Sequence, residues 1–157
     1  MEFNMGGFIF PALNSTEGIA VELYLSGCSR QPRCKGCHNP KLWDYNYGTS
    51  VTLEEIIRRL REEYKDADSI AIMGGEPLDQ QHIETLLKEI KTHFPEKMLW
   101  LYTSYELHEI IEGVKKYADF IKTGRYIEEL ACKGRLASSN QRIWKKEKDV
   151  FLPFETK

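Results

Sequence analysis

The sequence predicts an α/β fold, an open partial (βα) barrel, from two observations. Short apolar runs typical of strands alternate with longer segments whose apolar residues recur at helical spacing. This alternation indicates a parallel sheet with right-handed crossovers. A closed eightfold barrel needs about 250 residues, so the 157 residues here suffice for roughly five or six of its strands. A flavodoxin-like doubly wound sheet is the alternative, because helical faces alone do not show whether the sheet curls.

Length and hydrophobic content predict one domain that spans residues 1–157. The chain has 41% hydrophobic residues, and its 22 basic and 24 acidic residues leave a net charge of -2. Such a balance gives no general attraction to nucleic acid or to an acidic membrane, and the charged run at residues 145–148 reads as solvated surface.

The sequence shows no secretory signal and no run of about 20 apolar residues. We therefore expect a cytoplasmic protein.

The first elements are expected to be two strands, at residues 7–11 and 19–25, joined as a hairpin by a turn-rich stretch at residues 14–18. After a loop, Thr52 and Glu55 have the spacing of a capping box and predict the start of a helix. The apolar residues of that helix recur at helical spacing: Leu53, Ile56, Ile57, Leu60 and Tyr64.

Two further units of strand and helix follow. Residues 69–73 form a short apolar run that ends in glycines, as expected of a buried strand, and Asp79 is a candidate cap for the next helix. Residues 97–102 predict another strand, Ser104 is expected to cap a third helix, and residues 119–122 predict a last short strand. The buried stripes of the two helices are Ile83, Leu86, Leu87 and Ile90, and then Leu107, Ile110, Ile111 and Val114.

Histidines and aromatic residues give weaker signals. His82, His93 and His108 fall on predicted helices at spacings that suggest no pair of metal ligands, so each reads as surface. The aromatic stretch at residues 43–48 either covers a site or forms a partly exposed linker.

Three of the four cysteines lie in a single loop directly after the second predicted strand. Cys28, Cys34 and Cys37 have the spacing C-x5-C-x2-C, and the glycines and prolines among them let the loop curl its thiolates inward. A structural zinc site is normally closed by four ligands, whereas three thiolates on an iron–sulfur cube leave one iron free for a substrate. The alternatives are a zinc knuckle completed by His38 or Cys132, and three unrelated thiols. Cys132 by itself reads as an ordinary thiol.

A glycine turn, Gly74-Gly75-Glu76-Pro77, follows the strand at residues 69–73. Two glycines let a ligand approach the backbone closely, and the glutamate offers a carboxylate to a cationic group. A tight connection between strand and helix with an exposed glutamate has the same sequence pattern. The turn indicates a ligand site only in combination with the cysteine loop, because both follow strands whose ends meet at one edge of a parallel sheet.

Together the cysteine loop and the glycine turn resemble the radical S-adenosylmethionine superfamily. Further segments narrow the resemblance to the activating proteins of anaerobic ribonucleoside-triphosphate reductase, a small family, and it spans most of the chain. Two features depart from the superfamily pattern. The spacing C-x5-C is longer than the usual C-x3-C, and Gly36 stands where many members have an aromatic residue. The segments that narrow the resemblance are residues 34–40, 100–105, 119–126 and 138–142.

The resemblance implies a [4Fe-4S] cluster on Cys28, Cys34 and Cys37, with no catalytic residue beyond these ligands. It also implies that S-adenosylmethionine is cleaved reductively at the cluster. The 5′-deoxyadenosyl radical then generates a glycyl radical on the large subunit of anaerobic ribonucleoside-triphosphate reductase, with a donor such as a flavodoxin supplying the electron. The residues implied for S-adenosylmethionine binding are Gly36, Cys37, His38, Gly74, Gly75 and Glu76.

Two other functions are open at this point. One is a radical enzyme that acts on a small molecule, such as a deazaguanine synthase, and the other is a non-enzymatic zinc or iron–sulfur binding module. Small-molecule members generally add residues to close a substrate pocket, and this chain has few to spare. An activase can instead leave its partial barrel open for a polypeptide loop.

Overall fold

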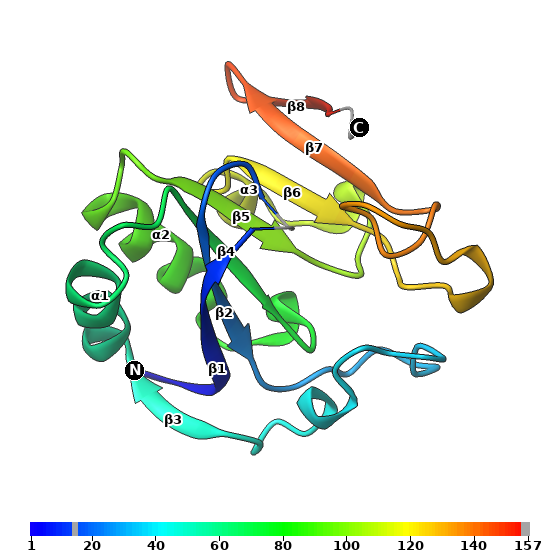
Figure 1. Cartoon of the computed structure of the whole chain (residues 1–157), viewed down its shortest axis with the longest axis horizontal. Coiled ribbons are helices and arrows are strands. Elements are labelled where there is room, and N and C mark those ends of the chain that lie inside the picture. The colour runs from blue at the N-terminus through cyan, green and yellow to red at the C-terminus, as the bar shows by residue number, and fades with distance from the viewer. Residues whose placement is uncertain (14–15, 155–157) are drawn as a thin grey trace.

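The computed structural model describes residues 1–13 and 16–154. The strands are β1 (Glu2–Ala12), β2 (Ala20–Leu25), β3 (Thr49–Thr52), β4 (Ser69–Gly74), β5 (Met98–Tyr102), β6 (Phe120–Thr123), β7 (Arg142–Glu147) and β8 (Val150–Pro153). The α-helices are α1 (Leu53–Glu62), α2 (Ile83–His93) and α3 (Glu112–Lys115). Short 3-10 helices span Pro40–Trp43, Pro77–Asp79, Leu107–Glu109 and Glu128–Leu130. The strands form one sheet in the order β3-β1-β2-β4-β5-β6-β7-β8 (Figure 1).

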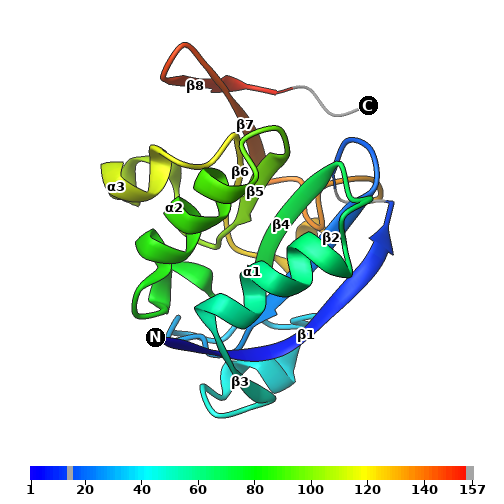
Figure 2. The same ribbon diagram turned by 90° about the vertical axis from the view of Figure 1, so that its left-hand side faces the viewer.

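The central strands β2, β4, β5 and β6 are parallel and follow one another across the sheet in chain order. Right-handed crossovers that always step in the same direction place every connecting helix on the same face. The helices α1, α2 and α3 do lie together on one face (Figure 2). A doubly wound sheet reverses direction and carries helices on both faces. The flavodoxin-like alternative is therefore wrong.

Side chains of the parallel strands alternate between two hydrophobic clusters. Ile70 and Ile72 of β4 pack under the helices, whereas Met73 faces the other side of the sheet. There the indole of Trp100 stacks on the ring of Phe120, with 4.1 Å between the ring centroids. The cluster on this second side is much the smaller of the two. The face opposite the helices therefore has room for the cavities described below.

Several predicted elements are confirmed. The strands β1 and β2 form the antiparallel hairpin, although β1 is longer than residues 7–11 because its first half pairs with β3. The helix α1 begins as predicted, since Thr52 Oγ1 accepts a hydrogen bond from the N–H of Glu55 at 3.1 Å. The strands β4, β5 and β6 lie where the apolar runs predict them. Of the predicted turn at residues 14–18, residues 14–15 lie outside the described part of the chain.

Two predicted helix caps are wrong. Asp79 ends a 3-10 helix, and the residue before α2 is His82, with a φ of 68°. Asp79 binds the cysteine loop instead. Ser104 donates to the buried carboxylate of Glu76, and burying that charge demands donors more strongly than a helix end does. The chain after β5 is thus held in a turn, and the predicted third helix is reduced to a 3-10 helix and the four-residue α3.

Three antiparallel strands are absent from the sequence prediction: the two edge strands, β3 and β8, and β7 beside β8. The charged run at residues 145–148, read as surface, lies mostly in β7. Lys148 and Asp149 connect β7 to β8 with φ values of 48° and 67°, as in the two-residue turns that suit a twisted hairpin. β7 pairs with β6 on one side and with β8 on the other, so backbone pairing holds this charged segment in the sheet. Composition alone therefore did not distinguish this hairpin from a solvated loop.

The surface assignment of three histidines is confirmed, because His82, His93 and His108 are all exposed. Only His93 lies on an α-helix, where its ring is 3.5 Å from the carboxylate of Glu89. Within residues 1–13 and 16–154, no helix combines the length and the apolar character needed to cross a membrane. That residues 1–157 form a single domain stays a prediction.

Candidate metal centre

Three thiols line one cavity, of about 190 Å³, beyond the carboxyl ends of the parallel strands. In Figure 1 the loop that carries them, in light blue, lies beyond the arrowhead of β2. Cys28, Cys34 and Cys37 are unpaired and half-buried. Burial raises the pKa of Cys28, and a bound metal ion reverses this effect because thiols coordinate in deprotonated form. Cys132 is exposed, and its sulfur donates to the carbonyl of Leu136 at 3.5 Å.

The arrangement of the thiols differs from that of a closed zinc site. Zinc–sulfur bonds of about 2.3 Å hold tetrahedral ligands roughly 3.8 Å from one another. Among the described residues, no three His, Cys, Asp or Glu side chains surround such a point. His38 packs its ring against Tyr126 with 4.7 Å between centroids, and Cys132 lines a different cavity. Three thiolates suffice for an iron–sulfur cube with one free iron, so a cluster needs no fourth ligand from these residues.

Backbone hydrogen bonds hold the start of the cysteine loop. The N–H of Gly27 donates to the carbonyl of Leu42 at 2.8 Å, and that of Cys28 to the carbonyl of Trp43 at 3.4 Å. The ring of Tyr45 occupies the place where a side chain on Gly27 would begin. The aromatic stretch therefore covers the beginning of the loop, as one of its two interpretations predicts.

Asp79 ties the cysteine loop to the loop that follows β5. Its Oδ2 accepts hydrogen bonds from the N–H of Ser29 at 2.8 Å and from the hydroxyl of Ser29 at 2.7 Å. Its Oδ1 accepts from the hydroxyl of Tyr105 at 2.8 Å. The guanidinium of Arg30 lies over the Tyr105 ring, 4.0 Å from its centroid. One carboxylate thus joins three segments that are far apart in the sequence, directly beside Cys28.

We expect Asp79→Ala to loosen the cysteine loop. The substitution removes three hydrogen bonds to a partly exposed carboxylate, so the free energy of unfolding should fall by about 1–3 kcal/mol. Urea unfolding of the apoprotein measures this loss, and iron content after anaerobic reconstitution should fall as well. Asp44→Ala is the matched control, because Asp44 accepts a local hydrogen bond from the N–H of Asn46. An Asp79→Ala protein with wild-type stability and full iron content would show that this link is dispensable.

The loop after β6 contacts the other end of the cysteine loop. Arg125 donates to the carbonyls of Gln31 and Pro32, and to the sulfur of Cys34 at 3.6 Å. Arg125 therefore binds the stretch that makes the spacing between Cys28 and Cys34 unusually long. Hydrogen bonds to the sulfur ligands are among the factors that set the reduction potential of a cluster, and this guanidinium is placed to supply one.

A short segment before β7 holds Arg125 in place. Gln141 accepts a hydrogen bond from the N–H of Ser138 at 3.1 Å and donates to the carbonyl of Gly124 at 3.0 Å. Asn140 donates to the carbonyl of Arg125 at 2.9 Å. Ser138 is fully buried. One of the segments that resembles the activating proteins thus serves to position the loop over the cysteines.

The glycine turn packs against the cysteine loop. A side chain on Gly74 would overlap the carbonyl of Leu25, and one on Gly75 would overlap the carbonyls of Leu42 and Gly27. The N–H of Gly75 donates to the carbonyl of Leu25 at 3.0 Å. Close approach of protein backbone therefore already requires both glycines. Both also line the first cavity.

Glu76 lies under the glycine turn and is fully buried. Its carboxylate accepts from the N–H and hydroxyl of Ser104 at 2.7 and 2.5 Å, from the hydroxyl of Thr103 at 2.7 Å, and from the N–H of Leu78 at 3.0 Å. Burial raises the pKa of Glu76, whereas these donors act in the opposite direction. A carboxylate has about four acceptor positions. Direct contact with the ammonium group of S-adenosylmethionine stays a prediction, and it requires that one of these hydrogen bonds be exchanged.

The structure places the residues predicted for S-adenosylmethionine binding in two groups. Gly36 and Glu76 do not border the first cavity, and a side chain on Gly36 would begin 3.1 Å from the carboxyl group of Glu128. Thr103 and Ser104, which the sequence prediction omits, do border it. The predicted residues that line the cavity are Cys37, His38, Gly74 and Gly75.

Several functional contacts escaped the sequence prediction. Asp79 and Ser29 are 50 residues apart, and Arg125 and Gln31 are 94 residues apart, so no local spacing connects them. For one missed residue, Lys122, the sequence did contain a signal. The alternation of side chains along the last predicted strand places Lys122 on the inner face of the sheet, where a lysine is unusual.

Comparison with known proteins agrees with this description. QueE from Escherichia coli has a similar fold, with a TM-score of 0.54 and 14% sequence identity over 78% of this chain and 71% of QueE. A family described as "4Fe-4S single cluster domain" matches residues 15–144. The fold and the site define a class of protein, the iron–sulfur proteins with the partial barrel of the radical S-adenosylmethionine type. The predicted fold class is confirmed.

Three relatives carry the name anaerobic ribonucleoside-triphosphate reductase-activating protein. The protein of phage T4 is 33% identical over 81% of this chain and 84% of its own length. The protein of Haemophilus influenzae is 32% identical over 73% and 79%, and that of Escherichia coli K12 is 30% identical over 79% and 86%. The chain belongs to the family of anaerobic ribonucleoside-triphosphate reductase-activating proteins. Its cofactors are a [4Fe-4S] cluster and S-adenosylmethionine.

Proposed function

We propose that this protein is an activase that generates a glycyl radical on the large subunit of anaerobic ribonucleoside-triphosphate reductase. Its relatives are named as activating proteins of that reductase. The observation that carries the proposal is the meeting of three thiols and the glycine turn at one open cavity. An open site suits a protein substrate, because the reacting glycine must come within about 3–3.5 Å of the radical carbon.

In this proposal Cys28, Cys34 and Cys37 hold the cluster, and one iron stays free for S-adenosylmethionine. The cofactors perform the difficult step, so the chain contributes orientation and exclusion of side reactions and needs no further catalytic residue. The residues proposed for S-adenosylmethionine binding are Gly36, Cys37, His38, Gly74, Gly75 and Glu76. Four of these six border the cavity directly, and Glu76 supports the turn that carries two of them.

When bound, the reduced cluster and S-adenosylmethionine would supply a 5′-deoxyadenosyl radical by one-electron cleavage of a carbon–sulfur bond. Transfer of a hydrogen atom from the glycine α-carbon to this radical would leave 5′-deoxyadenosine and a glycyl radical. Methionine is the other product. The chain's own task is to keep water and oxygen away from this exchange. Arg125 and Tyr126, on the loop after β6, contribute by holding the cysteine loop in position through Gln31, Cys34 and His38.

The test mixes the reduced protein, S-adenosylmethionine and the candidate reductase without oxygen. We expect the doublet of a glycyl radical in the electron paramagnetic resonance spectrum, together with 5′-deoxyadenosine in proportion to it. A reductase variant without its reacting glycine is the control. If deoxyadenosine forms without a glycyl radical, and a small molecule from a metabolite screen is consumed in step with it, a small-molecule radical enzyme is the better description.

The electron donor and the compartment complete the proposal. We infer a donor such as a flavodoxin and a cytoplasmic location. Three closely spaced thiols that stay unpaired suit a reducing compartment, where disulfides do not persist. Reduced flavodoxin should replace dithionite in the test above and give the same yield of glycyl radical.

A further inference from the structure

A second cavity, of about 620 Å³, continues from the first along the face of the sheet opposite the helices. The two cavities share several lining residues, so an occupant of the second can reach the edge of the first. The second cavity is open to solvent, and its outer rim is formed by the segment that includes Cys132 and Arg135. The shared lining residues are His38, Met73, Tyr102, Lys122, Tyr126 and Ala137.

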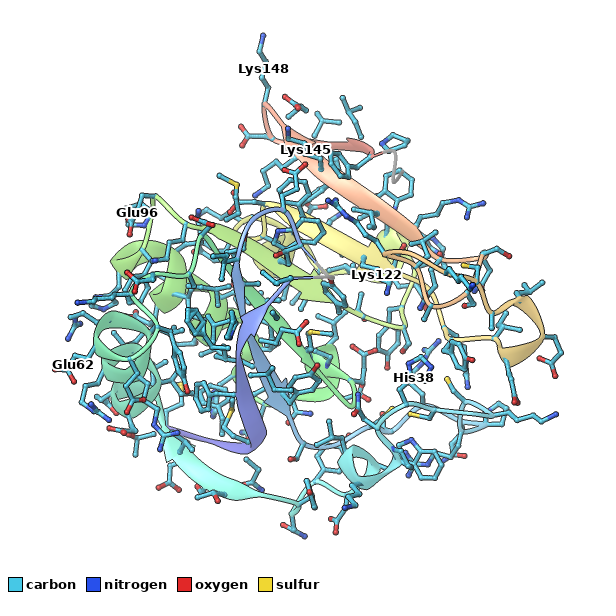
Figure 3. The ribbon with its side chains drawn as sticks, viewed as in Figure 1. His38, Glu62, Glu96, Lys122, Lys145 and Lys148 are labelled. Carbon is cyan, nitrogen blue, oxygen red and sulfur yellow. The ribbon has the colours of Figure 1, made fainter. Side chains whose placement is uncertain are left out.

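Lys122 stands at the junction of the two cavities. It lies on β6, and only 8% of its surface is exposed. Its ammonium group is 5.0 Å from the centroid of the Tyr102 ring, and it makes no hydrogen bond or ion pair with residues 1–13 or 16–154. Figure 3 shows Lys122 and His38 on the side of the sheet that faces the cysteine loop. Burial lowers the pKa of Lys122 to about 8, so most molecules carry the charge at neutral pH.

Lys122 lines both cavities, and an ammonium group at a cavity wall has three donors that an oxygen atom of a ligand can accept. The other shared residues offer aromatic rings, a thioether and a methyl group, which suit the apolar surface of a polypeptide. Glu22 also lines the second cavity, where it accepts a hydrogen bond from the hydroxyl of Tyr24 at 2.9 Å. A cavity open along one side admits a chain that continues into solvent, whereas pockets for small molecules enclose most of the ligand.

We propose that the second cavity receives the polypeptide segment that carries the reacting glycine, and that Lys122 donates a hydrogen bond to a backbone carbonyl of this segment. The inference rests on the proposed function and names the surface by which the protein substrate is recognised. A backbone carbonyl is the expected acceptor because every residue of an incoming segment provides one. Lys122 thus acts as a binding residue for the substrate and sets how far the segment enters toward the first cavity.

The test compares Lys122→Met with Lys122→Arg in the reconstituted protein. Methionine keeps most of the volume of the side chain and removes its donors. We expect Lys122→Met to raise the reductase concentration needed for half-maximal glycyl-radical formation by about tenfold or more, and Lys122→Arg to restore much of the loss. Lys146→Met is the control, because Lys146 is a half-buried lysine that donates to the carbonyl of Lys116, away from both cavities.

A second variant tests the cavity and leaves Lys122 in place. Cys132→Trp places a large ring at the rim of the second cavity and should also raise the half-saturating concentration of reductase, whereas Cys132→Ala should not. Calorimetric titration with S-adenosylmethionine accompanies each variant. If Lys122→Met weakens S-adenosylmethionine binding and leaves the reductase requirement unchanged, Lys122 serves the cofactor and the proposal is wrong. Absence of any glycyl radical with the wild-type protein would instead contradict the proposed function itself.

Discussion

Replacement of Cys28, Cys34 or Cys37 by alanine is expected to abolish the cluster, whereas Cys132→Ala retains it. Three thiolates hold the cube, and loss of one leaves too few ligands to retain it against exchange with solvent. Iron content after anaerobic reconstitution should fall to background in the first three variants. Electron paramagnetic resonance before and after addition of S-adenosylmethionine should show a change in signal only for the wild type and Cys132→Ala.

Cys132→Ala is the internal control, because Cys132 is exposed and lies on the rim of the second cavity. Full iron retention by Cys34→Ala, or loss of the cluster in Cys132→Ala alone, would overturn the assignment. The three alanine variants should unfold in urea much as the wild-type apoprotein does, since their thiols are only half-buried. Loss of iron therefore reports on ligation and not on misfolding.

Glu76→Ala is expected to weaken binding of S-adenosylmethionine by about 1–3 kcal/mol, the cost of losing hydrogen bonds to a charged group. The buried carboxylate accepts hydrogen bonds from Ser104, Thr103 and Leu78. Its removal leaves these donors without an acceptor beside the glycine turn, so the free energy of unfolding should fall as well. Anaerobic calorimetry measures the affinity, and urea unfolding of the apoprotein measures the stability.

Two further variants make this result interpretable. Glu54→Ala changes an exposed glutamate of α1 and should alter neither quantity. Ser104→Ala removes the hydroxyl group that donates to Glu76, but leaves the carboxylate of Glu76 in place. If Ser104→Ala reproduces most of the loss in affinity, Glu76 acts by holding the turn. Unchanged affinity in Glu76→Ala would remove Glu76 from the site.

Part of the fold could be predicted from local sequence patterns. The helical stripe of α1, its cap at Thr52 and the apolar runs of β4, β5 and β6 all depend on residues that are neighbours in the chain. The edge strands β3 and β8 and the charged strand β7 could not be predicted, because pairing with a partner strand decides their conformation more than their own side chains do. The third predicted helix failed for a related reason. Ser104, the expected cap, donates instead to a carboxylate that lies 28 residues earlier.

The sequence by itself determined the chemistry of this protein, because the three cysteines and the glycine turn are defined by spacing within single loops. Only the tertiary structure decided how these loops are held. It joined Asp79 to Ser29 and Arg125 to Cys34, across 50 and 91 residues of chain, and it buried Lys122 where two cavities meet. Such contacts follow from the order of the strands and the paths of the loops, which bring together residues that no local pattern relates.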